Sequence, residues 1–319
     1  PRYAAAFIAM LNVAAVAGTF LVARRYYGLR AAMIAGLLFA VNPWAVVMSR
    51  KVFTADVLAP MAVVLFAALL AAVVDRRPWG WALSVIVLAF MLLTTYSPAP
   101  LAVVLVVVLA VYRRRVRWSY LVLGALLAVV LASPYLYYLN LTRLQDVREG
   151  LREALAGTAG GARGASVLPV EFAVRLHAGA GIEALGGRVA PELAPSLGPM
   201  RYLARASGVV FLISLPLLVY LALRAWARWR EPQDPAIYVL PGLWLWLPLV
   251  LLALWRGSVA QHYLVVLWPV GFVAMGVALD RLLAALRSSS RRAWPLDFAL
   301  AGGVWAMLIA LVLSQAYGV

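Results

Sequence analysis

The sequence contains no cysteine, so neither disulfides nor thiolate metal sites can stabilise the fold. Charged residues are also scarce, at 13% of 319, and Lys51 is the one lysine among 28 basic residues. Apolar residues make up 66% of the chain, and its mean hydropathy is +0.93. This composition provides too little polar surface for a soluble globule of this length, and it therefore indicates an integral membrane protein.

The formal net charge of +16 does not indicate a nucleic-acid-binding protein, because no solvated basic domain is present. The apolar runs predict an all-α, polytopic transmembrane helical bundle, since each is long enough, or nearly so, to cross about 30 Å of hydrocarbon. We expect ten spans, at residues 3–22, 31–48, 57–74, 80–96, 99–112, 119–139, 203–223, 237–255, 264–283 and 296–317.

Arginine is concentrated in alternate connections between these spans, which predicts that those connections are cytoplasmic. The residues are Arg24, Arg25, Arg30, Arg76, Arg77, Arg113, Arg114, Arg115, Arg117, Arg224, Arg228, Arg230, Arg281, Arg287, Arg291 and Arg292. The short connections on the other side contain Arg2, Arg50, Lys51 and Arg256, so both ends of the chain are expected outside.

We expect three parts: transmembrane helices 1–6 in residues 1–139, an extracytoplasmic loop at 140–202, and transmembrane helices 7–10 in residues 203–319. The loop opens with a capping box at Thr142 and Gln145 and an apolar stripe that ends at Leu155. This pattern predicts an amphipathic interfacial helix. His177, further along, is interpreted as a solvated loop residue.

The polar break NPWAVVMSRKVFTADVLAP, residues 42–60, separates two apolar runs on the outer side. It holds Arg50, Lys51 and Asp56. One interpretation is a membrane-edge anchor, with the basic side chains among headgroups and Asp56 capping the next helix. The other is a phosphate site, because positive charge on the translocated side opposes the usual bias.

A second stretch, WRGSVAQHYLVVLWPV at residues 255–270, places Arg256, His262 and Tyr263 on the same outer side. A single histidine at a helix start is commonly interfacial. Together with Arg256 and the basic pair at residues 50 and 51, however, it could complete a cationic pocket.

These motifs resemble the GT-C superfamily of membrane glycosyltransferases, in particular the protein O-mannosyltransferase and aminoarabinose transferase type. The resemblance rests on NP followed by SR and D, on SPY at residues 133–135, and on HYL with a downstream proline at residues 262–269. It implies transfer of a sugar from a polyprenyl-phosphate carrier to a lipid, glycan or protein acceptor on the extracytoplasmic face.

Under that resemblance, cations would stabilise the charge that develops on the departing lipid phosphate. Lys51 would act as a point charge, and Arg50 or Arg256 as a two-pronged donor. His262 or Tyr263 would add a hydrogen bond to phosphate or sugar.

The resemblance also implies an acidic general base in the first outer loop, between the first and second membrane helices. The chain starts at Pro1, in what would be the second helix, so we expect an N-terminally truncated fragment that is inactive alone. Asp56 is the one acid on a short outer connection. It is a candidate for the base, although its place at a helix start favours capping.

The main alternative is a lipid or lipid-linked sugar flippase or transporter, and a scaffold subunit is a third possibility. Against transport, the acids of the spans lie near their ends, and no internal repeat is seen. No cofactor is indicated, a divalent metal is left open, and the preference for arginine suggests a bacterial inner membrane.

Overall fold

The computed structural model describes residues 2–50, 52–142, 145, 148–149, 152, 167–180, 198–227, 234–255 and 259–289. These residues form an all-α structure, as predicted. The α-helices are α1 (Arg2–Tyr27), α2 (Leu29–Ala40), α3 (Pro43–Ser49), α4 (Leu58–Val73), α5 (Trp79–Thr94), α6 (Ala99–Val111), α7 (Trp118–Leu141), α9 (Leu168–Ala178), α10 (Gly198–Ala227), α11 (Ala236–Leu254) and α12 (Trp268–Ser289). Three 3-10 helices are interspersed, η1 (Thr54–Val57), η2 (Arg113–Arg115) and η5 (Gln261–Leu267).

Six segments in the described parts of the chain are long and apolar enough to cross a membrane, which makes this a multi-pass membrane protein. They are Tyr3–Tyr27, Thr54–Val73, Trp118–Leu141, Arg205–Ala227, Ala236–Leu254 and Gln261–Ala285. A seventh arises if α2 and α3, which meet at a bend of 58°, form one broken span.

Two of the ten predicted spans form helices that are short for crossing a membrane. The runs at 80–96 and 99–112 form α5 and α6, of 16 and 13 residues, whereas about 20 residues cross the hydrocarbon core. The helix is interrupted between them because Thr95 adopts an extended conformation and Pro98 precedes the first residue of α6. The predicted span at 296–317 and most of the predicted amphipathic helix lie outside the described residues. Thr142 is the C-cap of α7, and its hydroxyl donates to Tyr138 O at 3.1 Å.

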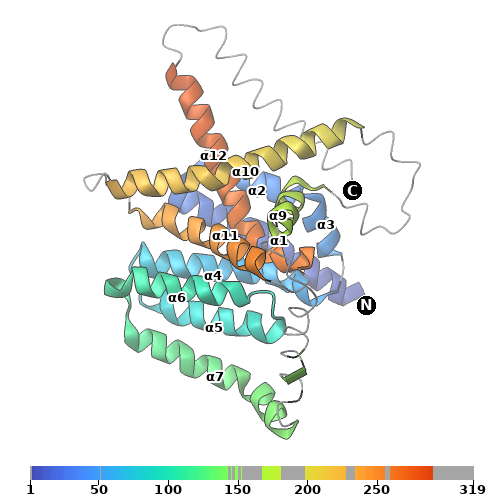
Figure 1. Cartoon of the computed structure of the whole chain (residues 1–319), viewed down its shortest axis with the longest axis vertical. Helices are drawn as coiled ribbons and strands as arrows, with labels where there is room; N and C mark the ends of the chain where they lie inside the picture. Colours follow the sequence, from blue (N-terminus) through green and yellow to red (C-terminus); the bar gives the residue numbers. More distant parts are fainter. Residues whose placement is uncertain are drawn as a thin grey trace.

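The core is centred on α4 and the continuous η5–α12 segment, with buried residues of α2, α10 and α11 packed around them. About 89% of the most apolar window of Gln261–Ala285 is buried, whereas the value for α7 is 11%. Helix α7 packs on α5 and forms one edge of the bundle (Figure 1). Small residues allow neighbouring helices to approach closely, both in the core and at this edge: a Cβ at Gly276 would lie 2.4 Å from Ala31 O, and one at Gly124 would lie 2.7 Å from Ala82 O.

One end of the bundle is tied together by charged and phenolic groups, and we call it the arginine-rich end. Arg25 pairs with Asp75 at 2.9 Å, Arg115 pairs with Asp234, and Arg281 donates to the Tyr238 hydroxyl at 2.7 Å. These contacts join α1, α4, η2, α11 and α12 at the ends that the arginine pattern assigned to a single side. The residues that define this end are Arg24, Arg25, Asp75, Arg115, Asp234, Tyr238, Asp280 and Arg281.

Candidate functional site

The opposite end of the bundle is organised by the bend between α2 and α3, and we call it the broken-helix end. Asn42 is the N-cap of α3, where its side-chain oxygen accepts from Ala45 N at 3.1 Å, and Pro43 follows in the first helical position. Both residue types favour a helix start, because the amide satisfies a free N–H and the proline ring fixes φ. The NP pair therefore ends one helix and starts the next at a defined angle.

The amide of Asn42 also holds α9, a helix from the long loop, against this bend. Its Nδ2 donates to Leu176 O at 2.9 Å and to His177 O at 3.3 Å, and the side chain is fully buried. Trp44, two residues later, donates through Nε1 to Ala180 O at 2.8 Å. The carbonyl groups at the end of α9 are thus satisfied by side chains of α3 instead of water.

His177 is fully buried in this arrangement, so its interpretation as a solvated loop residue is wrong. Its ring stacks on Phe211 with centroids 4.1 Å apart, and Phe272 lies at 5.2 Å. Nδ1–H donates to Ala173 O at 2.8 Å. The apolar surroundings lower the pKa of His177 to about 4, because burial penalises the imidazolium.

The polar segment after α3 leads to Asp56, the predicted acid. Arg50 is the C-cap of α3 and is exposed, while Lys51 lies outside the described residues. Asp56 is only 1% exposed, and its Oδ2 accepts from Phe53 N at 2.8 Å, a capping contact at the start of η1. Asn12 of α1 donates to Asp56 O at 3.4 Å, which ties η1 to the first helix.

His262 and Tyr263 lie in η5 and are half-buried. η5 contacts η1, and the Phe53 ring meets the His262 ring edge-on at 5.4 Å. The Tyr263 ring lies 4.7 Å from His262 in the same kind of geometry. Segments about 200 residues apart in sequence therefore meet at one end of the bundle.

The structure brings together only some of the predicted site residues. The segment that carries Asp56 and the one that carries His262 and Tyr263 come together, whereas Arg50 ends a helix with its side chain exposed. Arg256, like the lysine beside Arg50, lies outside the described residues. No group of three His, Asp or Glu residues that could hold a metal occurs in the parts of the chain described above.

Sequence reasoning missed two contributors to this end. Phe53 was not singled out, although it is the residue that contacts the His262 ring. Asn12 is a lone amide within an apolar run, and such a buried polar residue is itself a signal in a membrane helix. Its Nδ2 also donates to Ile8 O at 3.0 Å, so it is anchored within α1 while it reaches η1.

The family described as dolichyl-phosphate-mannose-protein mannosyltransferase matches residues 2–138. The match confirms the resemblance to GT-C mannosyltransferases that was noted in the sequence.

The fold is similar to that of ArnT from Cupriavidus metallidurans, solved bound to undecaprenyl phosphate (TM-score 0.58, 18% identity) and in the apo state (TM-score 0.54, 18% identity). The similarity covers 99% and 98% of this chain, and 61% and 60% of the ArnT chain. The chain thus spans about 61% of the ArnT length. A search of curated proteins by sequence finds no match.

Proposed function

We propose that this chain forms the membrane part of a glycosyltransferase that moves a sugar from a polyprenyl-phosphate carrier to an acceptor on the extracytoplasmic face. One observation carries the proposal. The family match covers the segment with Arg50 and Asp56, and η1 at the end of this segment contacts η5, which carries His262 and lies far beyond the match. That the related fold of ArnT was solved with undecaprenyl phosphate supports the same ligand class.

The proposed reaction requires positive charge near the departing phosphate. When the bond between the anomeric carbon and the phosphate oxygen breaks, negative charge develops on the lipid phosphate. Arg50 and Arg256 can each offer a two-pronged donor, and Lys51 a compact charge. His262 and Tyr263 would add hydrogen bonds to the phosphate or the sugar.

We assign Asp56 a positioning role, and we assign the role of general base to another carboxylate of the complete enzyme. The Oδ2 atom of Asp56 already accepts from Phe53 N in a buried position, which favours ordering of the Arg50 loop. Asp56→Asn tests this assignment, because an amide retains an acceptor oxygen but cannot take a proton. Transfer by the complete enzyme should then fall less than about tenfold, whereas loss of a general base lowers rates by about 10²–10⁴.

The proposal includes the finer topology of the sequence prediction. It places ten spans in a bacterial inner membrane, in two sets at residues 1–139 and 203–319. The broken-helix end then faces outward, and the loop at 140–202 lies on the same side with an amphipathic helix on the outer leaflet. The arginine distribution supports this orientation.

Binding of undecaprenyl phosphate by the 319-residue chain in detergent tests the site without requiring turnover. Lys51→Ala and His262→Ala should each weaken binding by about fivefold or more, because each removes a phosphate contact worth about 1 kcal/mol. Arg30→Gln is a matched control, since it removes an exposed charge at the other end of the bundle. Equal affinity of all variants would overturn the proposed site.

In the complete enzyme, Lys51→Ala should abolish most of the glycosylated product. A change in lipid flux with the product unchanged would instead indicate a transporter.

A further inference from the structure

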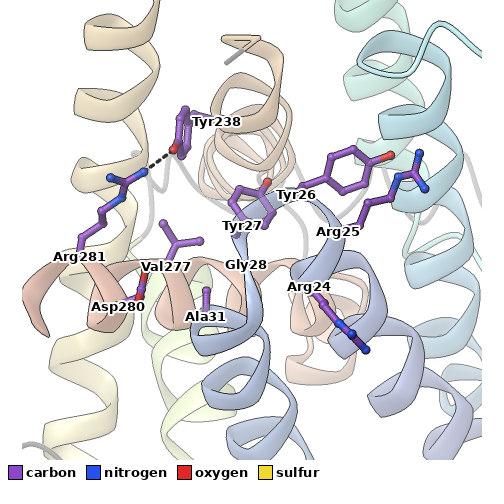
Figure 2. A pocket seen from close by; sticks show the side chains of 10 residues that line it. All are labelled: Arg24, Arg25, Tyr26, Tyr27, Gly28, Ala31, Tyr238, Val277, Asp280 and Arg281. Carbon is purple, nitrogen blue, oxygen red and sulfur yellow. Dashed lines mark hydrogen bonds between the residues drawn. The ribbon is translucent and has the colours of Figure 1, made fainter. Parts of the chain in front are cut away.

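A pocket of about 280 Å³ opens at the arginine-rich end, between the last turn of α1, the first turn of α2, the first turn of α11 and the middle turns of α12. Figure 2 shows its lining, with Arg281 directed at the Tyr238 hydroxyl and the Tyr27 ring between the two halves of the wall. The pocket shares no residue with the proposed transferase site.

The charged residues of this wall are mainly basic. They are Arg24, Arg25 and Arg281, with one acid, Asp280. Arg25 is already paired with Asp75, which lies outside the lining. Even with both carboxylates counted, the arginines leave an excess of positive charge.

The backbone adds to this electrostatic preference. Gly28, whose φ of 97° lies in the region that favours glycine, separates α1 from α2 and has no side chain to cap the new helix. Gly28 and Ala31 both line the pocket, so the uncapped first turn of α2 forms part of the wall. The positive end of the helix dipole and the free N–H groups at this position favour an anion.

The surroundings of the pocket are those of a membrane surface. It lies at the ends of three membrane-crossing helices, α1, α11 and α12. Leu29 and Leu282, the sequence neighbours of Gly28 and Arg281, are 54% and 48% exposed. Large exposed aliphatic side chains beside arginines fit an amphiphile, with its phosphate in the pocket that the arginines line and its acyl chains along the leucines.

We propose that this pocket binds the phosphate group of a phospholipid headgroup on the arginine-rich side of the membrane. Phosphate matches the arginine forks and the helix N-terminus, and the volume is sufficient for a single headgroup. The carboxylate of Asp280 disfavours a headgroup with several phosphates. The site extends the function of the protein beyond sugar transfer, since it would anchor α1, α2 and α12 to the leaflet opposite the proposed reaction.

Native mass spectrometry of the delipidated chain in detergent can test this site. The probe is phosphatidylglycerol, compared with diacylglycerol of identical acyl chains and with glycerol 3-phosphate. We expect phosphatidylglycerol adducts to dominate over both. Arg24→Gln should weaken them about fivefold, and Arg24→Gln with Arg281→Gln by a further factor of about five, because each arginine near a lipid surface contributes a similar increment.

Arg30→Gln is the control, because Arg30 is equally exposed, lies in α2 and does not line the pocket. Arg24 has no hydrogen bond or ion pair among the described residues, so its substitution should not affect folding. Equal binding of diacylglycerol, or equal loss in Arg24→Gln and Arg30→Gln, would overturn the proposal. Equal binding of glycerol 3-phosphate would overturn the lipid source and identify a soluble phosphate as the ligand.

The lipid-headgroup proposal is independent of the transferase proposal. At the proposed transferase site, binding of undecaprenyl phosphate depends on Lys51 and His262, and neither residue lines this pocket. A chain that loses one ligand and keeps the other therefore separates the two proposals.

Discussion

The two ends of the bundle are stabilised by different chemistry. At the arginine-rich end, charged side chains pair across helices, and the Arg25 side chain is 60% exposed in its ion pair. At the broken-helix end, Asn42 and His177 are fully buried, and Asn42 donates to carbonyl oxygens of α9. An exposed ion pair contributes little to the free energy of unfolding because water and salt screen it. Removal of a buried amide is more costly, because it leaves buried carbonyl oxygens without a donor.

The comparison also has a functional meaning. At the arginine-rich end, ion pairs such as that of Arg25 with Asp75 hold short connections in place. At the broken-helix end, neutral contacts position α3 and α9 while Arg50 remains exposed. Under the proposed function, an exposed cation such as Arg50 is available to a lipid phosphate.

Acid should affect the broken-helix end most strongly, through His177. Its pKa of about 4 in the folded chain lies below the ordinary value of 6.5, so the unfolded chain takes up the proton first. The free energy of unfolding therefore decreases as the pH falls from about 6.5 to about 4, by about 3 kcal/mol in total.

Thermal unfolding of wild type and His177→Phe, measured in detergent across this pH range, checks the effect. Phenylalanine keeps the stack on Phe211 but has no proton to accept, so its curve should be flatter than that of wild type. Parallel curves for the two proteins would contradict the assignment.

Gly271→Ala should disturb the same region with the next largest effect. A Cβ at Gly271 would lie 2.0 Å from His177 Nε2, so the ring must leave its position between Phe211 and Phe272. We expect a loss of about 2 kcal/mol, typical of overpacking in a dense core, visible as a lower unfolding temperature. Gly242→Ala is the control, because nothing lies within 4 Å of its added Cβ. Equal unfolding temperatures for the two alanine variants would show that the site tolerates the methyl group.

Asn42→Ala should lower the free energy of unfolding by about 1.5 kcal/mol, because it removes the α3 cap and the donor to Leu176 O and His177 O. Faster hydrogen exchange in α9 than in α4 would locate the damage. The exposed Asn140 of α7 provides the control, since Asn140→Ala removes the same amide away from α9. Unchanged exchange in α9 would mean that this helix is held by packing alone.

Asp75→Asn should give the smallest effect, below about 1 kcal/mol, although it breaks the contact with Arg25 and weakens the one from the Tyr26 hydroxyl. The difference from wild type should shrink further when the salt concentration is raised to about 0.5 M, since the pair is partly exposed. Arg77→Gln is the control, because it alters charge in the same connection. If Asp75→Asn lowered the free energy of unfolding more than Asn42→Ala does, the ranking of the two ends would be reversed.

Much of the architecture could be predicted from composition and local pattern. Long apolar runs require helices in a membrane, because every backbone N–H and C=O must be satisfied within the segment. The arginine positions predicted which connections lie at a common end, and contacts such as Arg25 with Asp75 bring several of them together. The NP pair at residues 42 and 43 marked a break that the structure shows as a bend of 58°.

Other features could not be predicted from local pattern. The runs that form α5 and α6 were predicted to be spans, but their helices have 16 and 13 residues, fewer than the roughly 20 that cross the hydrocarbon core. His177 looked solvated because it lies in a long connecting segment rich in charged residues and glycine, and nothing local shows that Phe211 and Phe272 enclose it.

The sequence by itself determined a helical membrane protein, its pattern of charge and the motifs that resemble those of GT-C glycosyltransferases. These properties follow from side chains that respond to their immediate surroundings, either lipid or water. Only the tertiary structure decided that Phe53 contacts His262, that Asn42 donates a hydrogen bond to α9 and that arginines of α1 and α12 line one pocket. Such contacts join residues far apart along the chain, and they exist because several helices pack at once, so no single segment encodes them.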